Sequence, residues 1–194
     1  MSTVATVEFT TYPQSVTAAL DAIGAGERLP ADGLIVLKPN LTTADPPPVT
    51  TDVRCVEAVL HYCRRYTSCT VAIGEGAGTG DTADTYNANG YAELAERENV
   101  ELLDFNHCPL VRKEHPDAVS LRPFYLPAVL ESAYVISIPV LKDHTITKTT
   151  VALKNLFGIA PATHYAGSFN KSKLHEPCTH QSVADLCLYK SPDL

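Results

Sequence analysis

Short apolar runs that alternate with helical patterns constrain the fold of this chain more than any other feature. The runs at 34–37, 70–73 and 134–139 are largely continuous, as expected of strands buried on both faces of a parallel sheet. Between the first two, apolar residues recur at helical spacing from Val53 to Cys63, with Thr51 or Asp52 as the capping residue. This βαβ pattern predicts an α/β fold with a mostly parallel open sheet and helices on both faces.

The other segments complete the predicted order of elements. We expect an opening strand at 4–9, a helix at 14–23, two short helices at 82–89 and 91–98, a fourth strand at 101–105, antiparallel strands at 110–113 and 119–125, a helical turn at 127–132 and a last helix at 181–188. No internal repeat or linker separates them. The sequence therefore predicts one α/β domain over 1–194.

Charge and composition exclude several classes of protein. A net charge of -7 argues against a general nucleic-acid binder, which needs a basic face to neutralise phosphates. Residues 1–9 have no secretory pattern, and no run reaches the roughly 18 apolar residues of a membrane span. We expect a cytoplasmic protein with its six cysteines reduced. None of them form a Cys-x-x-Cys pair, so no ferredoxin-type cluster motif is present.

Polar side chains follow three of the predicted parallel strands at the point where each strand ends. Lys38 and Asn40 follow the second predicted strand, and Glu75 follows the third. The strand at 134–139 leads into a loop at 142–147, and we expect a short helix after it that stops at Gly158. Parallel strands end at the same edge of a sheet, where ligands of α/β proteins bind. These groups are therefore predicted to converge.

Roles can be assigned to these groups from their chemistry. Lysines can hold an anion, and a histidine can transfer protons or bind a metal. The backbone N–H groups near Thr147 and Thr149, at the start of the expected helix, can hold a phosphate or carboxylate. We take His144, Lys142 and Glu75 as catalytic candidates, and Lys38, Asn40, Thr145, Thr147, Lys154 and Asn155 as ligand-binding candidates. A structural interpretation stays open for several of them, because threonines cap turns and a lysine near a helix end interacts with its dipole.

A second polar cluster lies near the end of the sequence. His175, Cys178 and His180 stand within six residues and are candidates for binding a metal ion. Their spacing matches no standard motif, and Pro177 constrains the turn, so a solvent-facing loop is the alternative. The glycine-rich segment 74–80 lacks both the dinucleotide and the Walker spacing, which argues against a nucleotide cradle.

Several of these segments resemble the domain-of-unknown-function family DUF362. The matching pieces are Val36-Leu-Lys-Pro-Asn-Leu41, residues 50–59, Ile73-Gly-Glu-Gly76, residues 139–158, His175 and Ala184-Asp-Leu186. The resemblance runs from about residue 34 to the end. Some family members are labelled iron–sulfur proteins because they carry an appended ferredoxin module, and nothing of that kind is present here. The typical domain of this family is longer and continues past the position that corresponds to Leu194. The resemblance therefore implies that this chain is a fragment, a shortened member or a partial gene model.

Three functions are compatible with these observations. The first is binding of a small anionic ligand at the carboxyl edge of the sheet, by an enzyme or part of one. The second is a metal-binding or redox protein that uses His144 with Glu75, or the cluster at 175–180, together with a redox partner. The third is a non-catalytic interaction module, with an open sheet edge that pairs with another chain or a second copy.

Overall fold

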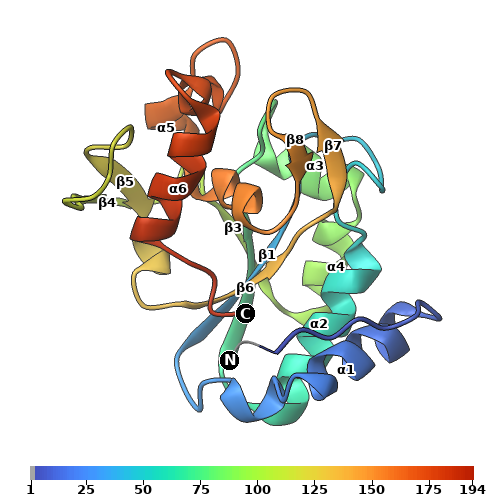
Figure 1. Ribbon diagram of the computed structural model, residues 1–194. Coiled ribbons are helices and arrows are strands. Elements are labelled where there is room, and N and C mark those ends of the chain that lie inside the picture. Colours follow the sequence, from blue (N-terminus) through green and yellow to red (C-terminus); the bar gives the residue numbers. More distant parts are fainter. Residues whose placement is uncertain (1–2) are drawn as a thin grey trace.

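A parallel sheet of four strands lies at the centre of the computed structural model, which describes residues 3–194 (Figure 1). Its strand order is β3–β2–β1–β6, formed by β1 (Leu34–Pro39), β2 (Thr70–Glu75), β3 (Glu101–Asp104) and β6 (Tyr134–Ile138). The register places Leu37 beside Ile73 of β2 and beside Ile136 of β6. The α/β fold and the parallel sheet are therefore confirmed.

Helices cover one face of the sheet and a mixed layer covers the other (Figure 1). The first face packs on α1 (Tyr12–Ala22), 3-10 helix η1 (Gly26–Arg28), α2 (Val53–Tyr66), α3 (Thr82–Ala88) and α4 (Tyr91–Glu98). The second packs on the β4–β5 hairpin (Leu110–Lys113 and Phe124–Pro127), η2 (Ala128–Leu130), η3 (Leu153–Ile159), α5 (Ala162–Tyr165), η4 (Ser172–His175) and α6 (Thr179–Tyr189). Both faces of β1 are buried, which is why its sequence is continuously apolar.

Local sequence signals set the ends of the helices. The Asp52 carboxylate accepts a hydrogen bond from Arg54 N at 2.9 Å, and so caps α2. Gly90 separates α3 from α4 with φ of 77°, a backbone angle that side chains disfavour. The predicted helices at 53–63, 82–89 and 91–98 are confirmed on these signals.

Two predicted strands are wrong. Residues 4–9 form no strand, because Val4 and Phe9 are exposed and no neighbouring strand pairs with them. The strand predicted at 119–125 begins only at Phe124. The reason is Asp185 of α6, a fully buried residue whose carboxylate accepts from the backbone N–H groups of residues 119–121 at 2.6–3.0 Å. Those groups are consequently unavailable for a strand ladder.

The last residues of the chain run beside the outer edge of β6. Asp193 N donates to Val135 O at 2.9 Å, and Ser137 N donates to Leu194 O at 2.8 Å. These bonds satisfy backbone groups at one edge of the sheet. Within residues 3–194 we find no helix with the length and apolar character that a membrane crossing requires.

Candidate functional site

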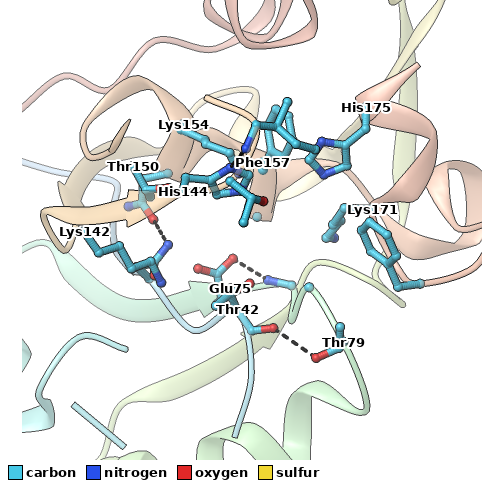
Figure 2. A pocket seen from close by; sticks show the side chains of 18 residues that line it. Thr42, Glu75, Thr79, Lys142, His144, Thr150, Lys154, Phe157, Lys171 and His175 are labelled. Carbon is cyan, nitrogen blue, oxygen red and sulfur yellow. Dashed lines mark hydrogen bonds between the residues drawn. The ribbon is translucent and has the colours of Figure 1, made fainter. Parts of the chain in front are cut away.

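The ends of β1, β2 and β6 meet at the carboxyl edge of the sheet (Figure 2). Lys38 and Asn40 stand at the end of β1, Glu75 stands at the end of β2, and β6 leads into the segment that contains Lys142. Lys38 Nζ lies 2.8 Å from Glu75 Oε2, and Lys142 Nζ lies 2.8 Å from Asn40 Oδ1. The structure thus brings these groups together although they are remote in sequence.

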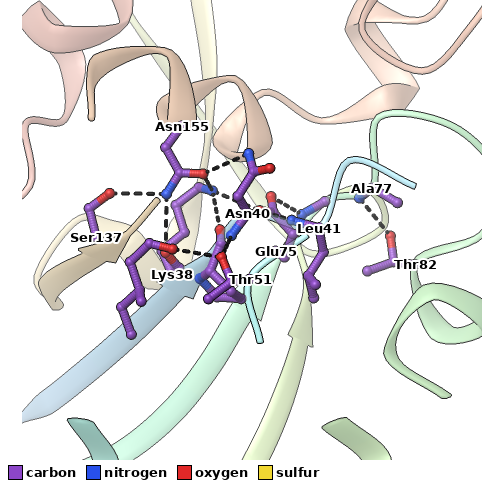
Figure 3. A network of polar contacts seen from close by, with 12 residues as sticks. Lys38, Asn40, Leu41, Thr51, Glu75, Ala77, Thr82, Ser137 and Asn155 are labelled. Atoms are coloured by element: carbon purple, nitrogen blue, oxygen red, sulfur yellow. Dashed lines mark hydrogen bonds and ion pairs between the residues drawn. The ribbon is translucent and has the colours of Figure 1, made fainter. Parts of the chain in front are cut away.

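The deepest element of the site is a buried ion pair between Lys38 and Glu75 (Figure 3). Their side chains are 0% and 3% exposed. Lys38 Nζ also donates to Pro39 O, while Glu75 accepts from Gly76 N at 2.8 Å and from Leu41 N at 3.3 Å. Burial lowers the pKa of Lys38, and the Glu75 carboxylate opposes that shift. Both charges are therefore held by dedicated partners.

Asn155 joins this ion pair to two strands (Figure 3). Its Oδ1 accepts from Lys38 Nζ at 3.3 Å and from Asn40 Nδ2 at 3.1 Å. Its Nδ2 donates to Lys38 O at 3.2 Å and to Ser137 Oγ at 3.0 Å. All four polar contacts of this buried amide are thus intramolecular, so Asn155 positions the strand ends.

The segment after β6 is a hairpin, which corrects the predicted loop and helix. Strands β7 (Lys142–His144) and β8 (Lys148–Thr150) pair antiparallel, and the 3-10 helix η3 follows. Thr147 N and Thr149 N are therefore not at a helix start; they donate to His144 Nδ1 and to Thr147 O. Lys154 lies in the first turn of η3 rather than near the end of a helix, and Gly158 lies inside it. The expected anion site on these two amides is withdrawn.

A pocket of about 380 Å³ opens between the hairpin, η3 and the sheet edge (Figure 2). This volume lies in the range of small-molecule sites. The pocket is lined by Asn40, Thr42, Glu75, Gly76, Gly78, Thr79, Lys142, His144, Thr145, Ile146, Thr150, Lys154, Asn155, Phe157, Gly158, Phe169, Lys171 and His175. It thus includes seven of the nine predicted catalytic and ligand-binding residues.

Positive charge dominates the lining of this pocket. Among residues 3–194, Glu75 is the one acidic side chain of the lining, and Lys38 already balances it. Lys142, Lys154 and Lys171 remain. Burial lowers the pKa of all three ammonium groups, to about 8 for Lys154 and for Lys171. The three ammonium groups outnumber the one carboxylate, which Lys38 already balances, so the pocket is suited to an anion.

Two histidines from different elements approach each other in the pocket. The rings of His144 and His175 lie 6.2 Å apart between centroids and are inclined by 17°. Burial, followed by the nearby Lys154, lowers the pKa of both imidazoles. His144 Nδ1 accepts from Ile146 N and Thr147 N, which leaves the proton of the neutral ring on Nε2.

The family-wide sequence profile of DUF362, described as a domain of unknown function, matches residues 35–194. The chain belongs to the DUF362 family. Neither the comparison with curated proteins nor the comparison with solved structures gave a match. The resemblance noted in the sequence is therefore confirmed, while the profile carries no reaction or ligand.

The segments that carried the DUF362 resemblance have different roles. Glu75 and residues of the stretch 139–158 line the pocket, and Lys38 pairs with Glu75 beneath them. Asp185, from Ala184-Asp-Leu186, instead binds the turn at 119–121 on the second face of the sheet. The DUF362 signature thus combines site residues with a residue that stabilises the fold.

Two of the predicted site residues of this DUF362 chain do not line the pocket. Lys38 does not line the pocket, because its ammonium group is buried beneath it and donates to Glu75 and Asn155. Thr147 does not line it either. Its hydroxyl donates to Thr149 O at 3.1 Å.

The metal cluster at 175–180 does not assemble. His175 faces the pocket and contacts Thr179 Oγ1, whereas Cys178 and His180 are exposed. Within residues 3–194, the group of potential ligands whose atoms all lie within 4.8 Å of one another is Glu57, His61 and Glu98. Arg64 and Arg97 already neutralise those two carboxylates.

Four polar residues of the pocket were not predicted from the sequence: Thr42, Thr79, Thr150 and Lys171. The Lys171 side chain is buried and donates to Asn106 Oδ1 and Ala160 O. Thr150 is 3% exposed, and its hydroxyl has no hydrogen-bond partner among residues 3–194. Lys171 stands in a polar stretch whose sequence does not indicate a site. Thr150 could have been identified, because it belongs to the same threonine-rich segment as Thr145 and Thr147.

Proposed function

We propose that the pocket binds a small organic anion that carries a carboxylate or phosphate group. The observation that carries this proposal is the charge of the lining: three lysines and two histidines surround a space with a single carboxylate, and Lys38 already neutralises that carboxylate. At an effective dielectric constant of about 20, two unit charges about 4 Å apart attract by on the order of 4 kcal/mol, against about 1 kcal/mol in bulk water. The lysines therefore attract an anion more strongly in the pocket than free ammonium groups do in water.

The hydrogen-bonding groups of the pocket support the same ligand. Thr150 Oγ1 is buried and unpartnered among the described residues, so it is free to donate to a ligand oxygen. Buried hydroxyls normally have a partner, and leaving one unpaired costs about 1–3 kcal/mol. A bound anion would supply that partner. His144 and His175 add donors and can exchange a proton with the ligand near neutral pH.

The lining favours an anion over a metal ion. A divalent cation would face Lys142, Lys154 and Lys171, and it would compete with Lys38 for Glu75. The oxygens of Glu75 already accept from Lys38, Leu41 N and Gly76 N. Two histidines without a free carboxylate or thiolate form an incomplete metal site.

Isothermal titration calorimetry with phosphate, oxalate, malonate and citrate tests the proposal. We expect saturable binding of at least one of these anions, and we expect Lys142→Ala to weaken it by about tenfold or more. The matched control is Lys173→Ala, because Lys173 is exposed on the adjacent η4 and does not line the pocket. Equal loss in both variants, or no saturable binding by the unmodified protein, contradicts the proposal.

A further inference from the structure

The four lysines at this site differ in what their ammonium groups contact. Lys38 donates to Glu75, Lys142 donates to Asn40 Oδ1 and Val49 O, and Lys171 donates to Asn106 Oδ1 and Ala160 O. These three ammonium groups are held in place, since each donates to oxygen acceptors.

Lys154 is the exception. Its Nζ lies 4.3 Å from the centroid of the Phe157 ring and has no hydrogen-bond or ion-pair partner among residues 3–194. Figure 2 shows Lys154, Phe157 and the two histidines gathered on one side of the pocket. A contact with an aromatic face leaves the nitrogen lone pair free once the proton is lost. Lys154 is therefore the lysine of this pocket that can act as a nucleophile.

We propose that Lys154 forms an imine with a small 2-oxo acid bound in the pocket. This inference rests on the proposed function, because the carboxylate of the oxo acid is the anion that the pocket would hold. Lys142 and the free Thr150 hydroxyl are the groups that would receive this carboxylate. The proposal adds a covalent step and a chemical class to simple anion binding.

Imine formation needs a neutral amine and a proton donor, and the pocket contains both kinds of group. The neutral Lys154 amine attacks the carbonyl carbon, forming the C–N bond and an alkoxide that takes up the proton released by nitrogen. Loss of the hydroxyl as water needs one further proton, which the imidazolium form of a pocket histidine supplies. The nitrogen lone pair closes the C=N bond, and the iminium formed returns its N–H proton to the now neutral imidazole. Oxo acid and amine thus give imine and water, with no oxidant or reductant.

The surroundings of Lys154 favour the reactive amine. The titratable groups that face it are Lys142 and His144 of β7 and His175 of η4, and none of them carries a negative charge. Burial and the Lys142 charge lower the pKa of Lys154 to about 8. At that pH the amine is therefore neutral in about half of the molecules. An unperturbed lysine would be neutral in only about 0.3% of molecules there. The Phe157 ring, 4.3 Å from Lys154 Nζ, favours the charged form.

Reductive trapping tests the proposal. The protein is incubated with pyruvate, glyoxylate or 2-oxoglutarate and cyanoborohydride, and the adduct is located by peptide mass spectrometry. We expect a mass gain on Lys154 equal to the oxo acid less one oxygen atom. The corresponding 2-hydroxy acids give no adduct. Binding is measured by calorimetry on the same samples.

Two variants separate the imine from the anion site. Lys154→Arg retains the charge but cannot form the imine, so the adduct should disappear while calorimetry still detects saturable binding of the corresponding 2-hydroxy acid. Lys173→Arg should react like the unmodified protein. Oxo acids that bind without any adduct, adducts on other lysines in preference to Lys154, or binding of phosphate without binding of oxo acids would each overturn the imine but leave the anion site standing. No binding of any anion would overturn both.

Discussion

Replacing Lys38 by methionine should destabilise the protein strongly. The substitution retains the length of the aliphatic side chain but removes the charge that lies 2.8 Å from Glu75 Oε2, in a pair with side chains 0% and 3% exposed. Breaking a buried pair by removing one partner costs about 3–5 kcal/mol. Because Leu41 N and Gly76 N still donate to Glu75, we expect the lower part of this range, about 3 kcal/mol.

Urea denaturation at pH 7 measures this loss as a change in the free energy of unfolding. For a chain of this size, it corresponds to a fall in Tm of about 6–12 °C. The matched control is Lys113→Met, which breaks the exposed pair with Glu131 and should cost at most about 1 kcal/mol. In the double variant Lys38→Met/Glu75→Gln, removal of the orphaned carboxylate should restore about 1 kcal/mol or more.

The result that refutes this reasoning is a Lys38→Met variant no less stable than Lys113→Met. Such an outcome would mean that the Glu75 carboxylate can be solvated or protonated without cost in the folded protein. Lys38 would then be dispensable for stability, and its role would have to be sought in ligand binding instead.

Three further predictions concern other parts of the molecule. Gly158→Ala should lower the free energy of unfolding by about 1–3 kcal/mol in urea melts, because its new Cβ would lie 1.6 Å from Glu75 Oε1 unless the ion pair moves; an unchanged melt would contradict the close packing. Asp185→Asn should have a lower free energy of unfolding than the unmodified protein at pH 7, and this difference should vanish in acid. The pKa of Asp185 is lowered by N–H donors from residues 119–121 and by Gln181 despite its burial, so this stability exists above the ordinary value of 3.8 and is lost as pH falls through the lower folded value; a difference that persists at pH 2 argues against it. Anion affinity should fall as pH rises through about 8, because the protonated forms of Lys154 and Lys171 bind the anion better, and calorimetry of Lys154→Met should show a weaker pH dependence.

The sheet and the convergence at its carboxyl edge could be predicted because both follow from local patterns. Buried parallel strands read as continuous apolar runs, and strands that share a direction must end at the same edge. Lys38, Glu75 and Lys142 were placed correctly for this reason, although their individual roles follow only from what each contacts.

The errors have physical causes that the sequence does not display. The threonine-rich segment 145–150 can form a turn, a helix start or a strand, and only pairing of β8 with β7 decides among them. The cluster at 175–180 looked like a metal site because its residues are adjacent in sequence. In three dimensions η4 directs His175 into the pocket, while Cys178 and His180 face solvent. Lys171 had no local signal at all, because its partners Asn106 and Ala160 come from other segments.

The two sides of the pocket are built on different scaffolds. Its floor belongs to the central sheet, where Asn155 and the Lys38–Glu75 pair join three strands into one fixed unit. Its roof is a hairpin of two three-residue strands, attached through β6 and η3. Insertions or deletions at the hairpin tip would therefore resize the space above an unchanged floor. A protein with this division can come to accept longer or shorter ligands while the core that folds it stays the same.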